Sequence, residues 1–475
     1  MRKVIFIAII VVAVGLAACT SPTGSSSAST DATLSVLTVT GGGSAITLSP
    51  AFSAATTSYT ASVPNTVTSV TVSATASNGG ATVSSGAGTI NLNLGTPTNT
   101  LSVKVTAANG VATQTYSVAI TRPVGLLFAI SVQTSASNTG LTLPATVKNG
   151  ALTLLATGSQ SYGAANGVSL HGTDVYVFGT IFSSAANSQT PVYWKNGTLN
   201  SLTIPAGIAS MASQQGWIDS AGNFYIRATN INYSGANSVL GYWKNWAWVS
   251  LPMTLPAEST AATQGNSFEG MSEDQSGNIY VNGYLTDPIS GLQVPVYWEN
   301  GSLYAVSLSS VSGASYGGQV QAVVSSPSLS SFTLLLTIDS SSSVPSPYYM
   351  VGNTITQALP AGATSINGGT VWWAAQSPSG VVYGTGQSGT SWPPSYPPAY
   401  VDNWSTLVAL PTPSGQPNGF TGGANFYGND VYIDGNTYSS SGLSSAVYWK
   451  NEALNLILPS GTAYVGSVEG GDTFD

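Results

Sequence analysis

The sequence predicts an all-β protein in which a small antiparallel β-sandwich precedes a β-propeller of seven blades. Three observations over the 475 residues carry this prediction. Apolar and polar residues alternate with a period of two in the first part of the chain, which is typical of half-buried strands. A short phrase then recurs about every fifty residues, as expected for four-stranded blades. No stretch between its copies has the apolar period of a helix.

The first 18 residues form an export signal. Arg2 and Lys3 are its basic start, and the apolar run over residues 4–14 is shorter than the ~20 residues of an ordinary membrane span. The end of the signal, LAAC at residues 16–19, resembles the lipobox of bacterial lipoproteins. The resemblance implies that Cys19, the single cysteine of the chain, is acylated and becomes the mature N-terminus. A plain signal peptide followed by an incidental cysteine is the alternative.

The lipobox also predicts where the protein resides. Several acyl chains anchor a protein stably in a membrane. The residue after the cysteine is Thr20 and not Asp, so the resemblance implies a bacterial cell-envelope protein anchored in the outer membrane. Residues 19–31, the acylated cysteine and a Ser/Thr-rich segment, lack apolar periodicity and are expected to form a flexible tether.

Composition excludes several functions. Charged residues make up 5% of the chain, and 17 acidic residues stand against 9 basic ones, so no basic patch is available to bind nucleic acid. One cysteine cannot form an internal disulfide, and one histidine, His171, cannot form a multi-histidine metal centre. We therefore expect no metal site and no cofactor.

Residues 32–122 predict the β-sandwich. Alternating segments such as residues 101–107 (LSVKVTA) are separated by turn sequences, among them residues 78–80 (NGG). Several segments, including residues 58–63 (SYTASV) and 105–110 (VTAANG), resemble the bacterial cadherin-like β-sandwich module. The segment contains no Asp or Glu, so the carboxylate cage that calcium needs in true cadherins cannot form. We interpret this module as a spacer.

Residues 126–475 predict the propeller. The recurring phrase is clearest at residues 192–197 (VYWKNG) and 296–301 (VYWENG). Its Asn-Gly is typical of a tight hairpin turn, and a second hairpin precedes each copy, which gives four strands per repeat. The phrase resembles the repeats of bacterial surface lipoproteins with propeller-type domains, a resemblance that implies no activity. Its Trp position recurs seven times, at residues 147, 194, 243, 298, 350, 401 and 449.

The two ends of the repeat region predict closure of the ring. The N-terminal side supplies three strands of a blade, and residues 463–468 (AYVGSV) resemble the missing innermost strand. Seven blades then use the whole region, whereas six or eight stay open because the fifth repeat matches poorly. Strands shared between the chain ends remove free sheet edges.

Residues that recur in every blade are predicted to be structural. The Tyr-Trp pair is expected to pack between blades, and the lysine that follows it is expected to be solvated, with Glu299 showing that the charge is dispensable. The loops at residues 219–223 (DSAGN) and 274–278 (DQSGN) resemble fragments of a calcium loop, but Asp capping its own turn is the favoured interpretation. His171 is expected in a surface turn.

Binding residues are expected among the residues that do not recur. In propellers the connections from strand two to strand three, and from blade to blade, gather on one face where ligands bind. Residues 391–398 (SWPPSYPP) are the most distinctive of these connections, because prolines stiffen two aromatic residues without a counterpart in other repeats. Stiffening of a long loop alone is an equal alternative. The candidate ligand-binding residues are Tyr233, Asp287, Asp339, Trp392, Tyr396 and Tyr438.

The leading hypothesis is a non-catalytic, membrane-anchored lipoprotein that presents this propeller face to a protein or a glycan. A glycan hydrolase or lyase is the first alternative, with paired carboxylates drawn from Glu269, Glu273, Asp287 and Asp339. A single arginine in the repeats, Arg227, argues against sialidase-like binding of a substrate carboxylate. An envelope-assembly scaffold is the second alternative. No catalytic residue is assigned.

Overall fold

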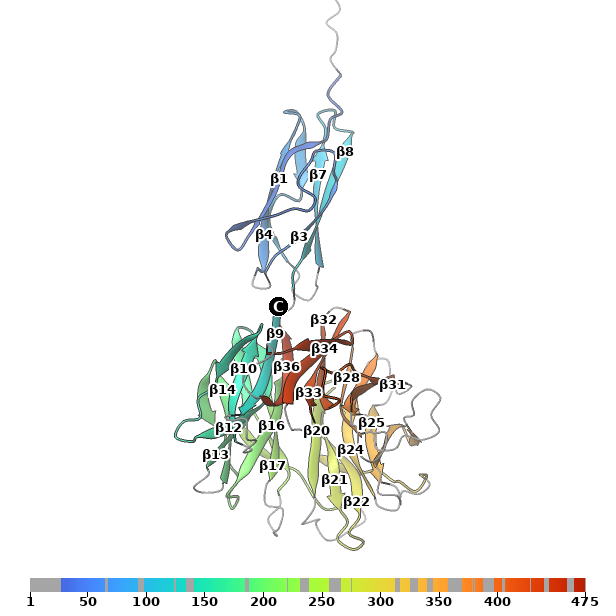
Figure 1. The fold of residues 1–475 in the computed structure, drawn as a ribbon. Helices are drawn as coiled ribbons and strands as arrows, with labels where there is room; N and C mark the ends of the chain where they lie inside the picture. Colours follow the sequence, from blue (N-terminus) through green and yellow to red (C-terminus); the bar gives the residue numbers. More distant parts are fainter. Residues whose placement is uncertain are drawn as a thin grey trace, which may run out of the picture. The chain divides into compact units, whose positions relative to one another are not determined.

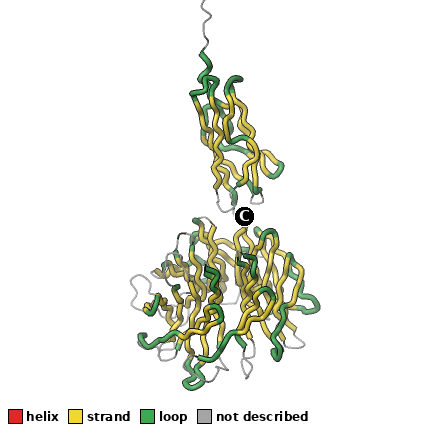
Figure 2. The backbone as a smooth tube through the Cα atoms, turned by 180° about the vertical axis from the view of Figure 1, so that it is seen from behind, coloured by secondary structure: helices red, strands yellow, loops and turns green. Residues whose placement is uncertain are grey.

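The computed structural model describes most of the chain as strands. Among its described residues there is no helix, and so none that could cross a membrane (Figure 2). The chain divides into two compact units at the Arg122–Pro123 bond. The described residues are 27–64, 67–92, 98–123, 125–133, 141–183, 188–219, 221–230, 239–255, 266–274, 276–311, 317–324, 332–339, 345–357, 370–377, 379, 381–387, 397–403, 406–427, 429–439, 444–458 and 465–474.

The first unit is the predicted β-sandwich. One sheet has the order β2 (Ser44–Ile46), β1 (Leu34–Gly41), β4 (Ser69–Ala76), β6 (Gly88–Asn91). The other has the order β3 (Ser58–Ser62), β8 (Thr113–Thr121), β7 (Thr98–Thr106), β5 (Thr82–Ser85). Its strand pairs are antiparallel except β3 with β8, which run parallel. This pair differs from the expectation because the chain crosses to the second sheet after β2 and joins its edge in the direction of β8.

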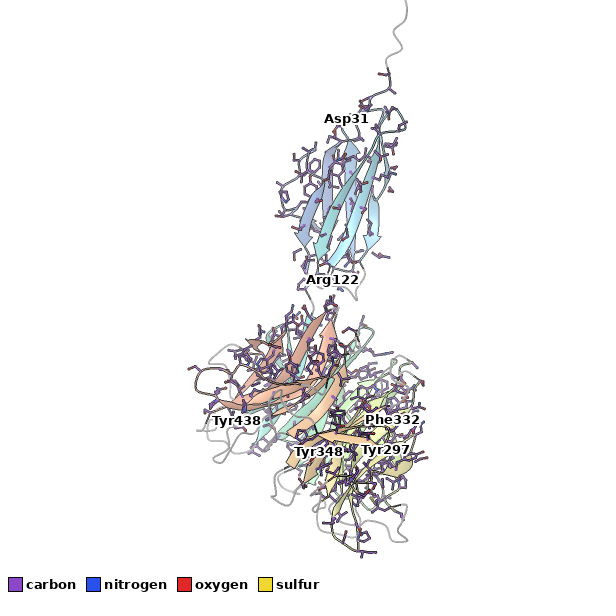
Figure 3. The ribbon with its side chains drawn as sticks, turned by 90° about the vertical axis from the view of Figure 1, so that its right-hand side faces the viewer. Asp31, Arg122, Tyr297, Phe332, Tyr348 and Tyr438 are labelled. Carbon is purple, nitrogen blue, oxygen red and sulfur yellow. The ribbon has the colours of Figure 1, made fainter. Side chains whose placement is uncertain are left out.

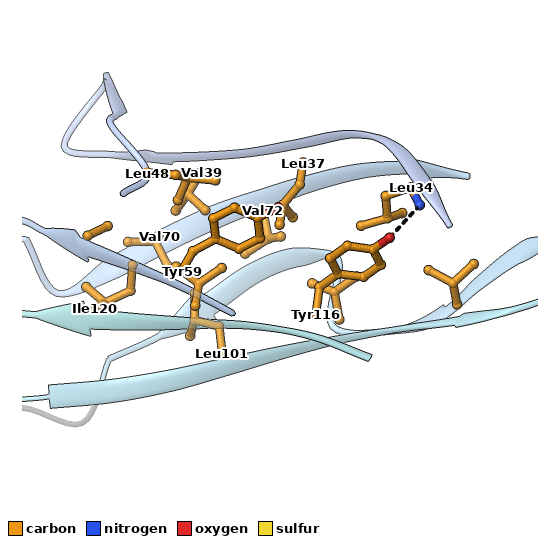
Figure 4. Packing of buried hydrophobic residues seen from close by; sticks show 14 of the residues in the cluster. Leu34, Leu37, Val39, Leu48, Tyr59, Val70, Val72, Leu101, Tyr116 and Ile120 are labelled. Carbon is orange, nitrogen blue, oxygen red and sulfur yellow. Dashed lines mark hydrogen bonds between the residues drawn. The ribbon is translucent and has the colours of Figure 1, made fainter. Parts of the chain in front are cut away.

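The sandwich core is built from the inward positions of these alternating strands. Val103, Val105 and Val118 have no exposed surface. Tyr116 spans the core between the sheets, where its hydroxyl accepts the Leu34 N–H at 3.1 Å, as Figure 4 shows, and donates to the Ala54 carbonyl at 2.7 Å. A buried phenol therefore has partners for its polar end while its ring fills the core.

The second unit is the predicted propeller, and its described residues form seven four-stranded sheets (Figure 1). Strand one is innermost, and it contacts strand one of the next blade at six of the seven boundaries between blades, whereas between blades 3 and 4 strand two of blade 3 contacts strand one of blade 4. In strand order one to four, blade 1 is β36 (Val465–Phe474), β9 (Gly125–Gln133), β10 (Thr142–Lys148), β11 (Ala151–Leu154); blade 2 is β12 (Tyr162–His171), β13 (Asp174–Ser183), β14 (Ser188–Lys195), β15 (Thr198–Ser201); and blade 3 is β16 (Met211–Ile218), β17 (Phe224–Asn230), β18 (Gly241–Lys244), β19 (Ala247–Ser250).

The remaining blades follow the same order. Blade 4 is β20 (Ser267–Glu273), β21 (Ile279–Thr286), β22 (Gln293–Glu299), β23 (Ser302–Ala305); blade 5 is β24 (Gly318–Val324), β25 (Thr333–Asp339), β26 (Pro345–Val351), β27 (Thr354–Gln357); blade 6 is β28 (Thr370–Gln376), β29 (Val382–Gln387), β30 (Pro398–Asp402), β31 (Thr406–Ala409); and blade 7 is β32 (Asn418–Tyr427), β33 (Asp430–Tyr438), β34 (Ser444–Lys450), β35 (Ala453–Leu456). The poorly matched fifth repeat forms a regular blade.

Blade 1 closes the ring as predicted. The C-terminal strand β36 pairs antiparallel with β9, with Val468 opposite Ile130, and the two lie side by side in Figure 1. The first and last strands of the propeller therefore belong to one sheet, and β9 has a partner strand on each side.

The recurring Trp joins neighbouring blades. Trp194, Trp243, Trp298 and Trp449 have no exposed surface. Each indole N–H donates to a backbone carbonyl that follows strand four of the preceding blade: Trp194 to Ala156 at 2.6 Å, Trp243 to Thr203 at 2.8 Å, Trp298 to Pro252 at 2.8 Å and Trp449 to Pro411 at 2.7 Å. The predicted packing role of this residue is confirmed, and the hydrogen bond explains why the residue is Trp.

The recurring Asn joins the two hairpins of a blade. Asn196 has a φ of 49°, and its side-chain oxygen accepts the Val175 N–H at 2.8 Å. Its own N–H donates to the Val175 carbonyl at 2.9 Å. Asparagine tolerates this left-handed backbone better than most residues. The same pair of bonds recurs at Asn149, Asn245, Asn300, Asn403 and Asn451.

Candidate functional site

The two ends of each blade differ in what they carry. The hairpins from strand one to two and from three to four form one end, here called the turn face. The connections from strand two to three and from one blade to the next form the other end, here called the loop face. Repeated residues crowd the turn face, whereas the connections of the loop face vary in length and sequence.

Three candidate binding residues lie at the loop face. Asp287 directly follows β21, Asp339 ends β25 and Tyr438 ends β33, so each sits where strand two of its blade stops. Tyr438 is partly exposed, and beside it Thr437 donates to the Gln416 amide oxygen at 2.7 Å. The other four assigned positions, namely Cys19, Tyr233, Trp392 and Tyr396, lie outside the described residues.

Asp287 organises its own loop. Its Oδ1 accepts the N–H of Ile289 at 2.7 Å and of Ser290 at 3.2 Å, and these hydrogen bonds hold the pKa of Asp287 below the ordinary 3.8. The loop therefore has a fixed shape, with the Ile289 side chain 81% exposed at its tip. The sequence pointed to the acid, whereas the structure places an aliphatic contact residue outermost.

Asp339 lies in a different environment. Burial raises the pKa of its carboxyl above the ordinary 3.8. Its backbone N–H donates to the Gly317 carbonyl at 3.0 Å, and Gly317 forms a parallel bridge with Gln293. Gln293 follows Leu292, whose carbonyl accepts the Asp287 N–H at 2.9 Å. Backbone contacts thus link the two acids across blades 4 and 5.

The four acids considered for catalysis do not form one group. Glu273 pairs with Ile279 at the turn-face end of β21, where its carboxylate lies 3.5 Å from the Trp217 indole nitrogen. Asp287 lies at the far end of the same strand. Eight residues of β21 at about 3.3 Å each separate these acids by roughly 25 Å. Glu273 is therefore too far from Asp287 to act with it.

A polar feature near the axis was not predicted. Strand one has a β-bulge in each of the seven described blades, and a polar side chain from strand two of the preceding blade bonds to the bulge in several of them. These bonds serve backbone groups that the bulge removes from the ladder. They run from Thr180 to the Ser213 carbonyl at 3.2 Å, Arg227 to Phe268 at 2.9 Å, Asn282 to Val320 at 2.9 Å, Thr385 to Gly422, and from the Val468 N–H to the Asn436 side chain at 3.2 Å.

A sequence signal for this feature exists. Near the start of strand two an aromatic residue is followed by an aliphatic one, as in Tyr225-Ile226 and Tyr280-Val281, and a polar residue comes next where the pattern is otherwise apolar. Arg227 is one such residue. Its guanidinium also donates to the Glu269 carbonyl, so it serves the joint between blades 3 and 4.

The calcium-like loops cap themselves, as predicted. Asp219 Oδ1 accepts the Asn223 N–H at 2.7 Å, and its Oδ2 accepts the Asn223 side-chain N–H at 2.7 Å. Asp274 makes the same bonds to Asn278 at 2.8 Å each. His171 is exposed, as predicted for a surface residue, but it is the last residue of β12 and directly precedes the hairpin turn.

The repeated lysines differ from the expectation of simple solvation. Lys195 pairs with Asp174 at 2.7 Å and Lys450 with Asp430 at 2.7 Å, although both side chains stay more than two-fifths exposed. The ammonium of Lys195 also lies 5.3 Å from the centre of the Tyr176 ring. Hairpin pairing places the acid, the tyrosine and the lysine together at the turn face.

Comparison of the sequence with known protein families supports the assignment of the first unit as a β-sandwich. Residues 34–123 match the family of cadherin-like beta sandwich domains. No curated protein matches the chain.

Three solved structures similar to the chain span different kinds of protein. The β-propeller domain of the Trilobed protease from Pyrococcus furiosus is 11% identical, with a TM-score of 0.41 over 72% of this chain and 95% of that one. A gluconolactonase from Xanthomonas campestris is 13% identical, with a TM-score of 0.34 over 66% and 95%. The lectin of Aleuria aurantia is 12% identical, with a TM-score of 0.31 over 72% and 94%.

Proposed function

We propose that the protein is a bacterial envelope lipoprotein that binds a protein or a glycan through the loop face of its propeller and performs no catalysis. One observation carries this proposal: the repeated side chains are engaged within the scaffold, whereas the described non-repeated candidates Asp287, Asp339 and Tyr438 stand where strand two stops at the loop face. The repeated Trp and Asn, exemplified by Trp449 and Asn451, bond within and between blades. They are accordingly committed to the fold.

The candidate residues follow the ring in chain order. Tyr233 falls between β17 and β18, Asp287 between β21 and β22, and Asp339 at the end of β25. Trp392 and Tyr396 fall between β29 and β30, and Tyr438 ends β33. Five consecutive blades, from 3 to 7, thus contribute at least one such residue, either at the end of strand two or in the sequence between strands two and three. A ligand bound there contacts several blades at once, with aromatic residues as its anchors.

Anchoring rests on the sequence. The lipobox-like residues 16–19 support acylation of Cys19, and residues 20–31 would supply a Ser/Thr-rich spacer of roughly 20 Å on average. The cadherin-like sandwich adds further length before the propeller. In this proposal the membrane is a partner only through the acyl chains.

A binding screen tests the proposal. The mature chain from Thr20 onward, without its acyl chains, is screened against glycan arrays and envelope or host-surface proteins. We expect specific binding that Trp392→Ala and Tyr396→Ala each reduce at least about tenfold, the cost of losing an aromatic anchor. Tyr304→Ala is the matched control, because Tyr304 is 43% exposed on β23, away from the loop face. Binding that all three substitutions weaken equally would refute the placement of the site.

Paired-carboxylate hydrolysis or lysis of a glycan is a second candidate, favoured by one observation. Asp287 has a lowered pKa and Asp339 a raised one, and they stand directly after strand two and at its end, respectively, in adjacent blades. Two acids whose pKa values are shifted in opposite directions can divide the roles of base and acid. Product release from a glycan panel, abolished by Asp339→Asn, would establish this function in place of simple binding.

A further inference from the structure

Three blades share a turn between strands three and four in which Asn is followed by Gly. The pairs are Asn149-Gly150 in blade 1, Asn196-Gly197 in blade 2 and Asn300-Gly301 in blade 4. Their backbones are nearly identical, with φ of 49–50° at Asn and 81–86° at Gly. All three asparagines are exposed, and a Cβ built on any of the three glycines would meet nothing within 4 Å. The three turns can therefore be compared directly.

Asparagine deamidates most readily where Gly follows it. The backbone nitrogen of Gly attacks the side-chain carbon Cγ of Asn, an N–Cγ bond forms, the Cγ–Nδ2 bond breaks, and ammonia leaves. Water then opens the resulting succinimide ring to give aspartate or isoaspartate. Gly favours the attack because it has no Cβ that could shield its nitrogen. The Asn side chain must first leave its own hydrogen bonds, since Cγ has to approach the Gly nitrogen.

In blades 2 and 4 two hydrogen bonds hold the asparagine side chain. Asn196 accepts the Val175 N–H through Oδ1 at 2.8 Å and donates through Nδ2 to Asp174 Oδ1 at 2.7 Å. In blade 4 the Asn300 Nδ2 donates to Asn278 Oδ1 at 2.9 Å, and its Oδ1 accepts the N–H that begins strand two at 3.0 Å. The second bond thus holds Nδ2, the atom that leaves as ammonia.

In blade 1 the described residues supply the first of these bonds and not the second. Asn149 Oδ1 accepts the Leu126 N–H at 3.0 Å. The residue before Leu126 is Gly125, which has no side chain to receive Nδ2, whereas Asp174 and Asn278 stand at this position in blades 2 and 4. Among the described residues, Asn149 Nδ2 has no hydrogen-bond partner. This asparagine is therefore the least restrained of the three.

We propose that Asn149 is the deamidation site among these three turns, and that the Gly150 nitrogen displaces ammonia from it faster than the same reaction takes place at Asn196 or Asn300. Each further hydrogen bond that must break slows the reaction, by about fivefold for the neutral amide partner in blade 4 and by about tenfold for the carboxylate partner in blade 2. The turns thus differ in rate although their backbones agree.

The modification acts on the blade that closes the ring. The turn joins β10 to β11, and β10 pairs with β9, which begins soon after Arg122, the last residue of the first unit (labelled in Figure 3). Isoaspartate adds a methylene group to the backbone of the turn, so the Leu126 N–H loses its acceptor. Deamidation therefore loosens blade 1 at the turn face, away from the loop face of the proposed function.

Ageing of the mature chain tests the site. The chain from Thr20 is kept in mildly alkaline buffer and digested with pepsin at acid pH, which avoids new deamidation, and its peptides are measured by mass spectrometry. We expect Asn149 to deamidate about tenfold faster than Asn196 and about fivefold faster than Asn300. The same chain unfolded in urea is the control, because the three turns then lack their hydrogen bonds and should react at similar rates.

Blade 7 supplies a control variant. Asp430→Ala removes the same side-chain bond from Asn451, but Glu452 and not Gly follows this asparagine. The variant disturbs one turn without exposing an Asn-Gly pair, so it should leave the deamidation rate at Asn149 unchanged. Circular dichroism melting curves establish that each variant is folded at the temperature of the experiment.

Two further variants exchange the restraint between blades 1 and 2. Asp174→Ala removes the partner of Asn196 Nδ2 and should raise deamidation of Asn196 about tenfold, to the rate of Asn149. Gly125→Asp should give Asn149 Nδ2 a partner and slow its deamidation. Equal rates at Asn149 and Asn196 in the folded wild-type chain would overturn the proposal, as would an Asp174→Ala variant in which Asn196 reacts no faster than before.

Discussion

At the scale of single residues, the repeated asparagine determines the local structure of the turn face. One side chain accepts the N–H that begins strand two, and in blades 2 and 7 it also donates to an aspartate. The Asn196 backbone is left-handed, a conformation that costs most other residues about 1 kcal/mol or more. This combination explains why the phrase repeats Asn.

Asn196→Ala should lower the free energy of unfolding by about 1–3 kcal/mol, since it removes two side-chain hydrogen bonds and strains the turn. Urea unfolding followed by Trp fluorescence measures the change. Asn200→Ala is the control, because the Asn200 side chain donates to the nearby Thr198 carbonyl within its own strand. A change in unfolding free energy as small as that of the control would contradict the role of Asn196 in joining the two hairpins of the blade.

The pKa shifts of Asp339 and Asp287 predict opposite effects of ionisation on the stability of the fold. Burial raises the pKa of Asp339 above 3.8, so its charge opposes folding at pH 7 and this opposition fades as the pH falls below the folded pKa. Backbone hydrogen bonds lower the pKa of Asp287, so its charge stabilises the fold above pH 3.8 and that stabilisation is lost as the pH falls through the folded pKa.

Asp339→Asn should therefore raise the melting temperature at pH 7, and Asp287→Asn should lower it. Both differences from the wild type should shrink toward pH 3. Calorimetry at several pH values checks both signs with one pair of variants. Shifts of the same sign at pH 7 would show that the environments of the two acids have been misassigned.

At the scale of elements, the joints between blades decide stability. Each of four tryptophans ties strand three to the segment that leaves the preceding blade, and polar side chains of strand two serve the bulges of the next strand one. These joints are hydrogen bonds between sheets, in addition to apolar packing.

Trp449→Phe should cost about 1–3 kcal/mol, because the Pro411 carbonyl loses its donor while most of the ring volume remains. Trp248→Phe is the control, since the partly exposed Trp248 indole donates to the Ser250 hydroxyl within its own strand. Guanidinium unfolding of both variants measures the difference. Equal costs would mean that the joint contributes only packing.

Much of the fold was predictable from the sequence, and the reasons are local. Period-two alternation and Asn-Gly turns gave the strands, and the spacing of the Trp position gave seven blades, with β36 as the missing strand. The parallel pair of β3 with β8 was not predictable, because it depends on which edge the chain joins after crossing between sheets.

The site was less predictable for the same kind of reason. Loop length identified Asp287, but its role in capping depends on the backbone conformation of residues 287–290, which places Ile289 outermost. From the sequence, Glu299 was expected only to replace the repeated lysine without consequence. The pairing of β21 with β22 places Glu299 opposite Tyr280, a neighbour that the sequence alone did not identify.

At the scale of the whole molecule, the propeller depends on its last strand. Deleting residues 465–475 removes strand one of blade 1, exposes the inner edge of β9 and opens the joint to blade 7. We expect the propeller to lose its cooperative unfolding transition and to become sensitive to protease, while the separate sandwich persists. Adding a peptide of residues 465–475 should restore part of the transition, and a truncated chain that melts like the full one would contradict the closure role.

Because the chain is synthesised from its N-terminus, the two strands that close the ring become available at different times. The sandwich is complete once residue 122 has emerged, so it can fold while the rest of the chain is still being synthesised. Blade 1 instead waits for β36, which emerges more than 300 residues after its partner β9. During that delay β9 has an exposed edge that can pair with the wrong strand, and β9 contains no charged residue to oppose such pairing. Synthesis of β36 is then the event that covers this edge of β9 and closes the propeller.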